Sequence, residues 1–316
     1  MTGLLLRVLL GAALLHTVAT APTKHVVGRG IAMPAGYSRI LFQDDFSTQA
    51  AGSPPSPAKW AVQAGTGYAN GPESWGTHEV QSYGDSRDNL RVTAAGTLLI
   101  TPINKGGSWT SGRIETASGI TLVCAAGAKL RIEASLRFGE APVWQQMGIW
   151  PSFWAMGSDL RRRPNEMWPS AGEVDIAESI NGVPTVWHTL HCGTAPAGPC
   201  DEFTGISSTA PFSRGDFHTV AVEIDRTNPG GDWRGETLTW YVDGAVTATV
   251  AGTRVNDEAA WTAVTRNPKF LILNVAIGGD FPDNVANDAH VHTPTPQTVG
   301  GAGASLEVNY VAVFST

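Results

Sequence analysis

The stretch Trp168-Pro-Ser-Ala-Gly-Glu-Val-Asp-Ile-Ala-Glu178 places three carboxylates within six residues, at Glu173, Asp175 and Glu178. In a β-strand alternate side chains share a face, so Glu173 and Asp175 point one way while the apolar residues between them point into a core. Glu178 is out of phase by one position. A β-bulge near residues 176–177 adds one residue and returns Glu178 to the carboxylate face. We therefore predict a bulged strand that presents all three acids together.

Carboxylates at this spacing suit the cleavage of glycosidic bonds. Retaining glycosidases use two carboxyl groups about 5–5.5 Å apart, one as nucleophile and one as general acid. Glu173 and Glu178 are the candidates for this pair, because side chains that lean inward close most of the distance along the strand. Asp175 between them can hydrogen-bond the nucleophile and separate the two glutamate pKa values, which assigns the acid and base roles. The alternative is a solvated strand edge with chance acidity, and the tryptophans around the stretch argue against it.

The motif Glu173-x-Asp175-x-x-Glu178, preceded by Trp-Pro-x-x-Gly, resembles the active-site strand of glycoside hydrolase family 16, in its laminarinase-like branch. Similarity to the family extends from about residue 42 to residue 314. The other segments that carry it are residues 148–157, 189–192, 273–279 and 307–313. The resemblance implies an all-β fold, a jelly-roll β-sandwich of the concanavalin A-like type, whose concave sheet forms the substrate cleft.

Strand patterns along the chain also indicate an all-β domain. Residues 129–137 and 218–225 alternate apolar and polar side chains, and residues 269–275 form a nearly continuous apolar run. An Asp-Gly pair within residues 237–246 predicts a hairpin. Many short strands separated by turns are typical of a sandwich or barrel. Helical character is confined to residues 257–265.

The chain divides into three predicted units. Residues 1–21 have the pattern of a secretory signal peptide, because an apolar run with one arginine ends in Ala19-Thr-Ala21. The run is too short to span a membrane, so a membrane anchor is the less favoured alternative. Residues 22–38 are polar and aperiodic, which predicts a pro-segment or disordered lead. Residues 39–316 form the catalytic domain, and we expect a secreted, extracellular protein.

Composition narrows the class of partner. The net charge is −7 and there is no basic tract, which argues against a nucleic-acid partner. Thirty-six glycines and 11 tryptophans against 16% charged residues suggest many turns and an aromatic groove. We expect a monomer that binds a β-1,3-linked polysaccharide, with no membrane partner.

Three cysteines lie beyond the predicted signal peptide. Cys192 and Cys200 flank a Gly- and Pro-containing loop that can turn back on itself, and a disulfide there suits an oxidising compartment. Cys124 is left over and is expected to be a buried free thiol. A metal site made from His188, His191 and the paired cysteines fits no common zinc spacing, so no metal is expected.

The resemblance also suggests cleft residues. His191 corresponds to a family residue that contacts the sugar near the cleavage point, whereas His188 and Trp154 are expected in the core. The loop 68–82 corresponds to one that lines the donor side. The candidate substrate-binding residues are Trp150, Trp168, His191, Arg113, Glu79 and Gln81.

One departure from the family concerns calcium. Many relatives bind a structural calcium through an aspartate near the end of the last strand, in a Val-Asp-Tyr sequence. Asn309 occupies that position here, and it supplies a carbonyl oxygen without a charge. The resemblance implies no cofactor, and a structural calcium is disfavoured.

The function that we predict is a secreted retaining endo-glycosidase that hydrolyses laminarin-type β-1,3-glucan by double displacement. An endo-β-1,3-galactanase with the same triad is one alternative. A transglycosylase, with sugar in place of water as acceptor, is another. A non-catalytic lectin-like protein on the same fold is the alternative from a different class.

Overall fold

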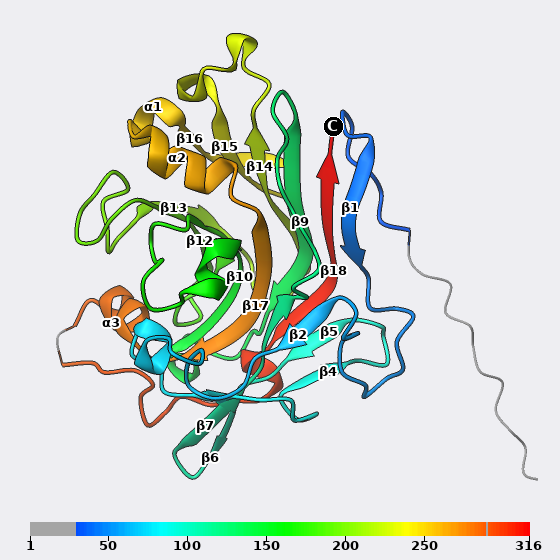
Figure 1. Ribbon diagram of the computed structural model, residues 1–316. Helices are drawn as coiled ribbons and strands as arrows, with labels where there is room; N and C mark the ends of the chain where they lie inside the picture. Colours follow the sequence, from blue (N-terminus) through cyan, green and yellow to red (C-terminus); the bar gives the residue numbers. More distant parts are fainter. Residues whose placement is uncertain (1–29, 289) are drawn as a thin grey trace, which may run out of the picture.

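The computed structural model describes residues 30–288 and 290–316. The predicted signal peptide and residues 22–29 of the predicted lead lie outside these ranges. Within them the chain folds into two large antiparallel sheets (Figure 1) and a small third sheet. The expectation of an all-β jelly-roll sandwich is confirmed.

The first sheet has the strand order β16-β15-β14-β9-β18-β5-β4, and β1 pairs with β18. Its strands are β1 (Arg39–Asp44), β4 (Leu90–Val92), β5 (Leu98–Ile100), β9 (Lys129–Phe138), β14 (His218–Asp225), β15 (Thr237–Val242), β16 (Ala245–Ala251) and β18 (Leu306–Ser315). The second sheet has the order β13-β12-β11-β10-β17-β8-β2. Its strands are β2 (Trp60–Val62), β8 (Arg113–Thr116), β10 (Ile149–Gly157), β11 (Glu173–Glu178), β12 (Thr185–His191), β13 (Ile206–Pro211) and β17 (Lys269–Ile277).

Short elements complete the described part of the chain. The third sheet contains β3 (Ser82–Tyr83), β6 (Ile103–Lys105) and β7 (Ser108–Ser111). The α-helices are α1 (Gly252–Val255), α2 (Glu258–Thr265) and α3 (Asp280–Ala286). The 3-10 turns are η1 (Glu73–Gly76), η2 (Val143–Gln145), η3 (Ser158–Arg162), η4 (Pro229–Gly231), η5 (Trp233–Gly235) and η6 (Ala302–Ala304).

Alternating burial explains why the two sheets pack. Apolar side chains at every second position of β9, from Leu130 to Leu136, are buried in the core. Arg131 and Glu133 lie between them and pair on the opposite face. A fully buried aliphatic side chain of this kind contributes roughly 1.5–3 kcal/mol. β17 is buried at every position, in agreement with the apolar run in its sequence.

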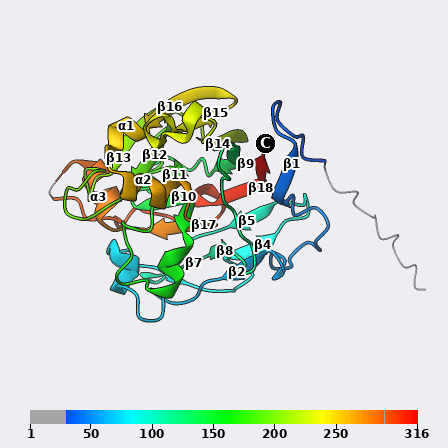
Figure 2. The same cartoon turned by 45° about the horizontal axis from the view of Figure 1, so that its top comes forward.

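Local signals place the hairpin and α2 as expected, but α1 and α3 lie outside residues 257–265, so the expectation that helical character is confined to that stretch is wrong. Asp243 and Gly244 join β15 to β16 with φ angles of 50° and 79°, the left-handed values that a two-residue hairpin turn of this type requires. The side chain of Asp257 accepts the backbone N–H of Ala260 and caps α2. Figures 1 and 2 show α1 and α2 at the same end of the sandwich as β15 and β16.

The disulfide prediction is confirmed. Cys192 and Cys200 are bonded, with their Cα atoms 5.3 Å apart. Cys124 is a buried free thiol, and burial raises the pKa of that thiol to about 12. It therefore remains uncharged and unreactive over the physiological range.

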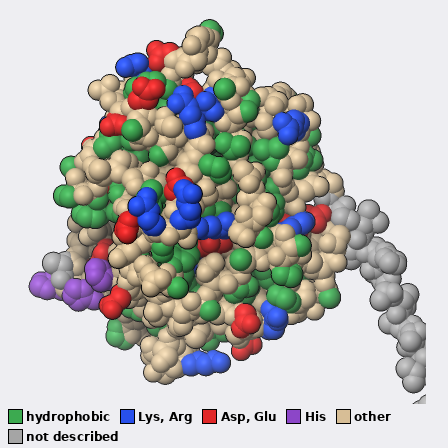
Figure 3. Space-filling view, in the orientation of Figure 1, with side chains coloured by type: hydrophobic (Ala, Val, Ile, Leu, Met, Phe, Trp, Pro, Cys, Tyr) green, Lys and Arg blue, Asp and Glu red, His purple; other side chains and the backbone are tan. Residues whose placement is uncertain are grey.

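The first described residues pack on the sandwich, and the surface of the protein carries charges of both signs. Tyr37 hydrogen-bonds Glu223 of β14, and its ring lies 6.2 Å from that of Phe314, so the residues before β1 pack against the first sheet. Acidic and basic side chains are interspersed on the face in Figure 3, with histidines gathered at one edge. None of the helices in residues 30–288 and 290–316 is long and apolar enough to cross a membrane.

Candidate active site

The predicted bulge is present in β11 and brings the three carboxylates to one face. Between Asp175 and Glu178, β11 advances three residues while β12 advances two, from Thr189 to Trp187. Against β10 the register shifts at the same place. The partners of Glu173, Asp175 and Glu178 are Met156, Trp154 and Ser152 on β10, and His191, Thr189 and Trp187 on β12. Because these partners step by two, all three acids share one face.

The backbone carbonyls at the bulge are satisfied from the core side. His188 Nδ1 donates to the carbonyl of Ile176 at 2.7 Å, and Trp240 Nε1 donates to that of Asp175 at 2.9 Å. The other ring nitrogen of His188 contacts the Thr247 hydroxyl at 3.0 Å. Burial lowers the pKa of His188 to about 4, so the ring is neutral. His188 is a core residue, as predicted, and it stabilises the irregular strand because buried carbonyls need a donor.

Glu178 has the environment of a general acid. It is 6% exposed, and Trp150 Nε1 and Ser152 Oγ donate to its Oε1 at 2.7 Å and 3.3 Å. Burial, together with the repulsion of Glu173, raises the pKa of Glu178 to about 7, although the bond from Trp150 works in the opposite direction. A carboxyl with such a pKa carries a proton below neutral pH and can donate it.

Glu173 and Asp175 share this face of β11 with Glu178. Trp168 Nε1 donates to Glu173 Oε2 at 2.7 Å. Burial raises the pKa of Glu173, while His191 and the bonds from Trp168 and Asp175 lower it. Burial and the repulsion of Glu178 and Glu173 hold the pKa of Asp175 well above its usual range. The net effect still raises the pKa of Glu173, and the hydrogen bond between the two carboxyls lowers the pKa of Glu173 while it raises that of Asp175, which favours the proton on Asp175.

His191 lies opposite Glu173 in the sheet and joins the cluster. Its Nε2 is 3.5 Å from Asp175 Oδ2, and its Nδ1 is 2.7 Å from Glu202 Oε2. Burial disfavours the imidazolium, yet the Glu202 hydrogen bond and the surrounding carboxylates raise the pKa of His191. Sequence reasoning missed Glu202. Its signal was its place two residues after Cys200, because the disulfide returns that loop to Cys192, the neighbour of His191.

Trp150 and Trp168, two of the candidate substrate-binding residues, also contact the carboxylates of β11. Trp150 and Trp168 each donate an indole N–H to one of the two glutamates. The expectation that Trp154 lies in the core is confirmed only in part, because it packs against a smaller apolar cluster that includes Met156 and Phe270 and is not fully buried. It is half-buried on the carboxylate face, where it pairs with Asp175 in the ladder and donates to Asn274 Oδ1 at 2.8 Å. The bulge explains the difference, since it sets which β10 residues share the face of the acids.

Arg113 lies on the same face and anchors its far side. Its strand β8 pairs with β17, which pairs with β10. The guanidinium donates to the Tyr68 hydroxyl at 2.8 Å and Glu115 Oε1 at 3.3 Å, and lies 4.3 Å from the centre of the Trp75 ring and 4.9 Å from that of Trp154. Arg113 is therefore a buried side chain that organises the aromatic residues of this region.

Glu79 and Gln81 form a buried hydrogen-bonded pair, and the charge of Arg113 acts on Glu79. Glu79 Oε2 accepts from Gln81 Nε2 at 2.6 Å and from the Tyr83 hydroxyl at 3.0 Å. Gln81 is 0% exposed, and its Oε1 accepts the backbone N–H of Ile277 at 2.7 Å. Both polar groups of Gln81 are used within the protein, which is at odds with a direct sugar contact.

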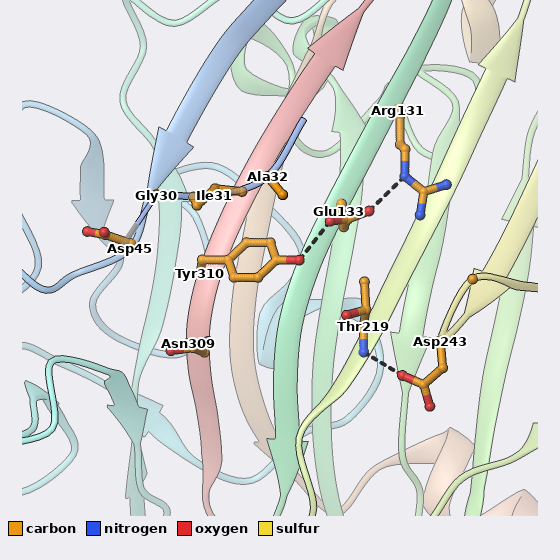
Figure 4. A pocket seen from close by; sticks show the side chains of 11 residues that line it. Gly30, Ile31, Ala32, Asp45, Arg131, Glu133, Thr219, Asp243, Asn309 and Tyr310 are labelled. Carbon is orange, nitrogen blue, oxygen red and sulfur yellow. Dashed lines mark hydrogen bonds and ion pairs between the residues drawn. The ribbon is translucent and has the colours of Figure 1, made fainter. Parts of the chain in front are cut away.

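A pocket on the other face of the first sheet contains Asn309 (Figure 4). Glu133 there accepts from Arg131 at 2.7 Å and from the Tyr310 hydroxyl at 2.7 Å. Asp45 Oδ1 accepts from the backbone and hydroxyl of Ser47. Among the described residues no group of three or more His, Cys, Asp or Glu side chains could hold a metal ion. The carboxylates of this pocket have protein partners, which fits a calcium site poorly.

The chain is similar in sequence to a known catalytic domain and to a known enzyme. A family model described as "XgeA-like, catalytic GH16 domain" matches residues 138–231. The chain is 27% identical over 323 residues to a "Beta-glucanase" from Rhodothermus marinus, covering 99% of this chain and 93% of that protein.

Solved structures are also similar. An endo-1,3-beta-glucanase from Streptomyces sioyaensis is 39% identical, with a TM-score of 0.83, over 91% of this chain and 99% of that one. An endo-beta-1,3-glucanase from Pyrococcus furiosus is 26% identical, with a TM-score of 0.63, over 88% of this chain and 94% of that one.

The contacts at the bulge generate a testable prediction. His188→Leu keeps an apolar ring-sized volume but leaves the Ile176 carbonyl buried without its donor, which costs about 1–3 kcal/mol. We expect the free energy of unfolding in urea to fall by that amount, and turnover to fall at least tenfold because Glu178 loses its fixed position. Thr247→Val, which removes only the far partner of the ring, is the matched control. Wild-type stability and turnover in His188→Leu would contradict this account of the bulge.

Proposed function

Since the chain belongs to glycoside hydrolase family 16, we propose that it cleaves its substrate by double displacement, with Glu173 as nucleophile and Glu178 as general acid and base. The enzyme is an endo-β-1,3-glucanase, the activity for which its relative from Streptomyces sioyaensis is named. The observation that carries the mechanism is the paired arrangement on β11. Each glutamate accepts an indole N–H at 2.7 Å, and Asp175 lies between them on the same face of the strand.

In the first step Glu173 attacks the anomeric carbon and Glu178 protonates the oxygen that leaves. A carbon–oxygen bond to Glu173 forms as the glycosidic bond breaks, and the Glu178 proton goes to the departing sugar. The Trp168 N–H and the Asp175 proton stabilise the Glu173 carboxylate before attack. They also hold it in one rotamer, which reduces the entropy cost of reaching the transition state.

In the second step the roles of Glu178 reverse. The ionised carboxylate takes a proton from water, the water oxygen attacks the anomeric carbon, and the bond to Glu173 breaks. Loss of negative charge on Glu173 in the glycosyl-enzyme removes one source of repulsion from Glu178, so its pKa falls and it becomes the base. The cycle returns both groups to their starting protonation states.

Carboxyl groups supply all of the proton transfers in this scheme, so we propose that turnover requires no cofactor. We also propose secretion, which the Cys192–Cys200 disulfide supports because such bonds persist in oxidising compartments. We further propose that the signal peptide ends at residue 21 and that the pro-segment or lead ends at residue 38. We propose a monomer.

We prefer a β-1,3-glucan to a β-1,3-galactan as the substrate, because the similar proteins are named as glucanases. The two sugars differ at the C4 hydroxyl, so polar side chains that bond that hydroxyl decide between them. Trp150, Trp168, His191 and Arg113 remain our proposed substrate-binding residues. Glu79 is buried and its two oxygens accept from Thr77, Gln81 and Tyr83, so its contacts, like those of Gln81, are at odds with a direct sugar contact. Gln81 supports Glu79 from behind.

Separate roles for the two glutamates predict separate defects. Glu173→Gln should abolish turnover of laminarin by several orders of magnitude with an unchanged melting temperature. Glu178→Ala should be as harmful on laminarin but much less so on an aryl glycoside whose leaving group needs no proton. Steady-state kinetics on both substrates make the comparison. Equal losses on the two substrates would remove Glu178 from the acid role.

The pKa values predict the pH profile. Glu178 must be protonated for the first step, and since its pKa is raised to about 7, activity on laminarin should fall as the pH rises through that value. Glu173 must be ionised, so activity should also fall at acidic pH. In Glu178→Ala, assayed on an aryl glycoside, the alkaline limb should disappear while the acidic limb stays. A persistent alkaline limb in that variant would mean that another group is the acid.

A further inference from the structure

We propose that Glu202 is a positioning residue for the nucleophile: it holds His191 as a cation against Asp175, and that cation keeps Glu173 ionised. The proposal rests on the role of Glu173 given above. It assigns a function to the segment that follows the Cys192–Cys200 disulfide.

The Glu202 carboxylate is fully buried and both of its oxygens are engaged. Oε1 accepts the backbone N–H of Cys192 at 2.8 Å, and Oε2 lies 2.7 Å from His191 Nδ1. In the described ranges its ion-pair partner is His191, with no lysine or arginine beside it. A buried carboxylate is costly unless it is paired. Glu202 therefore favours the doubly protonated imidazole, whose second N–H then points at Asp175.

The segment around Glu202 is held on three sides. The disulfide ties Cys200 to the strand that carries His191. Asp201 pairs with Arg254 of α1. Phe203 is 67% exposed and its ring stacks on Trp168, with the ring centres 5.9 Å apart and the planes inclined by 13°. The disulfide and the Asp201–Arg254 pair thus fix the position of Glu202, and Phe203 of the same loop packs on Trp168, which hydrogen-bonds Glu173.

The charges around His191 decide the sign of the effect. Glu173, Asp175 and Glu178 of β11 act on it, and Glu202 faces it from the loop. The Trp168 ring, with its centre 5.6 Å from that of His191, and the backbone at Gly205 also lie against the imidazole, and neither carries a charge. The imidazolium lowers the pKa of Glu173 more strongly than the Glu202 charge raises it. Removing the Glu202 charge, and with it the cation, should therefore make Glu173 harder to ionise.

Glu202→Gln tests this directly because it keeps the shape of the side chain. The amide can still accept from Cys192 and can donate to a neutral His191, so the ring stays in place without its charge. We expect the acidic limb of the kcat/KM profile on laminarin to move to higher pH by about one unit, with little change in KM. Glu202→Asp, which restores the charge, should bring the limb back toward the wild-type position.

Glu236→Gln is the matched control. Glu236 is another buried carboxylate, bonded to Arg226, Arg266 and Trp261 away from the acids of β11. Its substitution should lower the melting temperature and leave the acidic limb unmoved. A limb that shifts equally in both variants would reduce the Glu202 effect to general destabilisation and overturn the proposal.

A second measurement needs no turnover. The ¹⁵N shifts of the His191 ring in the wild-type protein should show an imidazolium at pH 7, and in Glu202→Gln a neutral ring at the same pH. A neutral His191 in the wild type overturns the proposal even if Glu202→Gln fails to fold. If instead the ring is charged but laminarin is not cleaved, the proposed function fails while the pairing of Glu202 with His191 stands.

Discussion

The structure of the site depends on one extra residue in β11. A regular strand would turn Glu178 into the apolar core, where an ionisable group without partners is expensive. The bulge places it with Glu173 and Asp175, and the carbonyls that the bulge displaces are bonded by His188 and Trp240 from the core side. The irregular backbone is therefore stabilised by the sandwich interior, and the chemistry on the other face relies on that support.

Electrostatic interactions give the three carboxyl groups of β11 different pKa values and therefore different roles. Three carboxyls on one short strand repel one another, so they cannot all be ionised at neutral pH. Burial and repulsion raise the pKa of Asp175 well above its usual range and that of Glu178 to about 7. Burial also raises the pKa of Glu173, and His191 and Trp168 offset part of that increase by favouring its anion. The loop after the disulfide also affects the nucleophile, because its Glu202 pairs with His191. A segment outside the carboxylate motif therefore contributes to the charge around Glu173.

The features that could be predicted from the sequence are those that depend on local patterns of residues. Alternation in β9 and the apolar run of β17 gave the sheets, and three acids in six residues required the bulge. Sequence reasoning placed Trp154 in the core but did not place it on the carboxylate face, because the face of a β10 residue depends on the register with β11 and not on β10 alone. It missed Glu202, although the predicted disulfide brings the residues after Cys200 back toward His191. It assigned Gln81 to the sugar because burial and pairing across loops are tertiary properties that the neighbours of Gln81 in the sequence do not reveal.

The most direct test of the account is the configuration of the first product. If Glu173 and Glu178 lie on one face as nucleophile and acid, hydrolysis passes through a glycosyl-enzyme and two inversions. Proton NMR during the first minutes of laminarin hydrolysis should then show new reducing ends as the β-anomer, with the α-anomer rising only by later mutarotation. Initial formation of the α-anomer would contradict the double displacement and the pairing of carboxyls on which it rests.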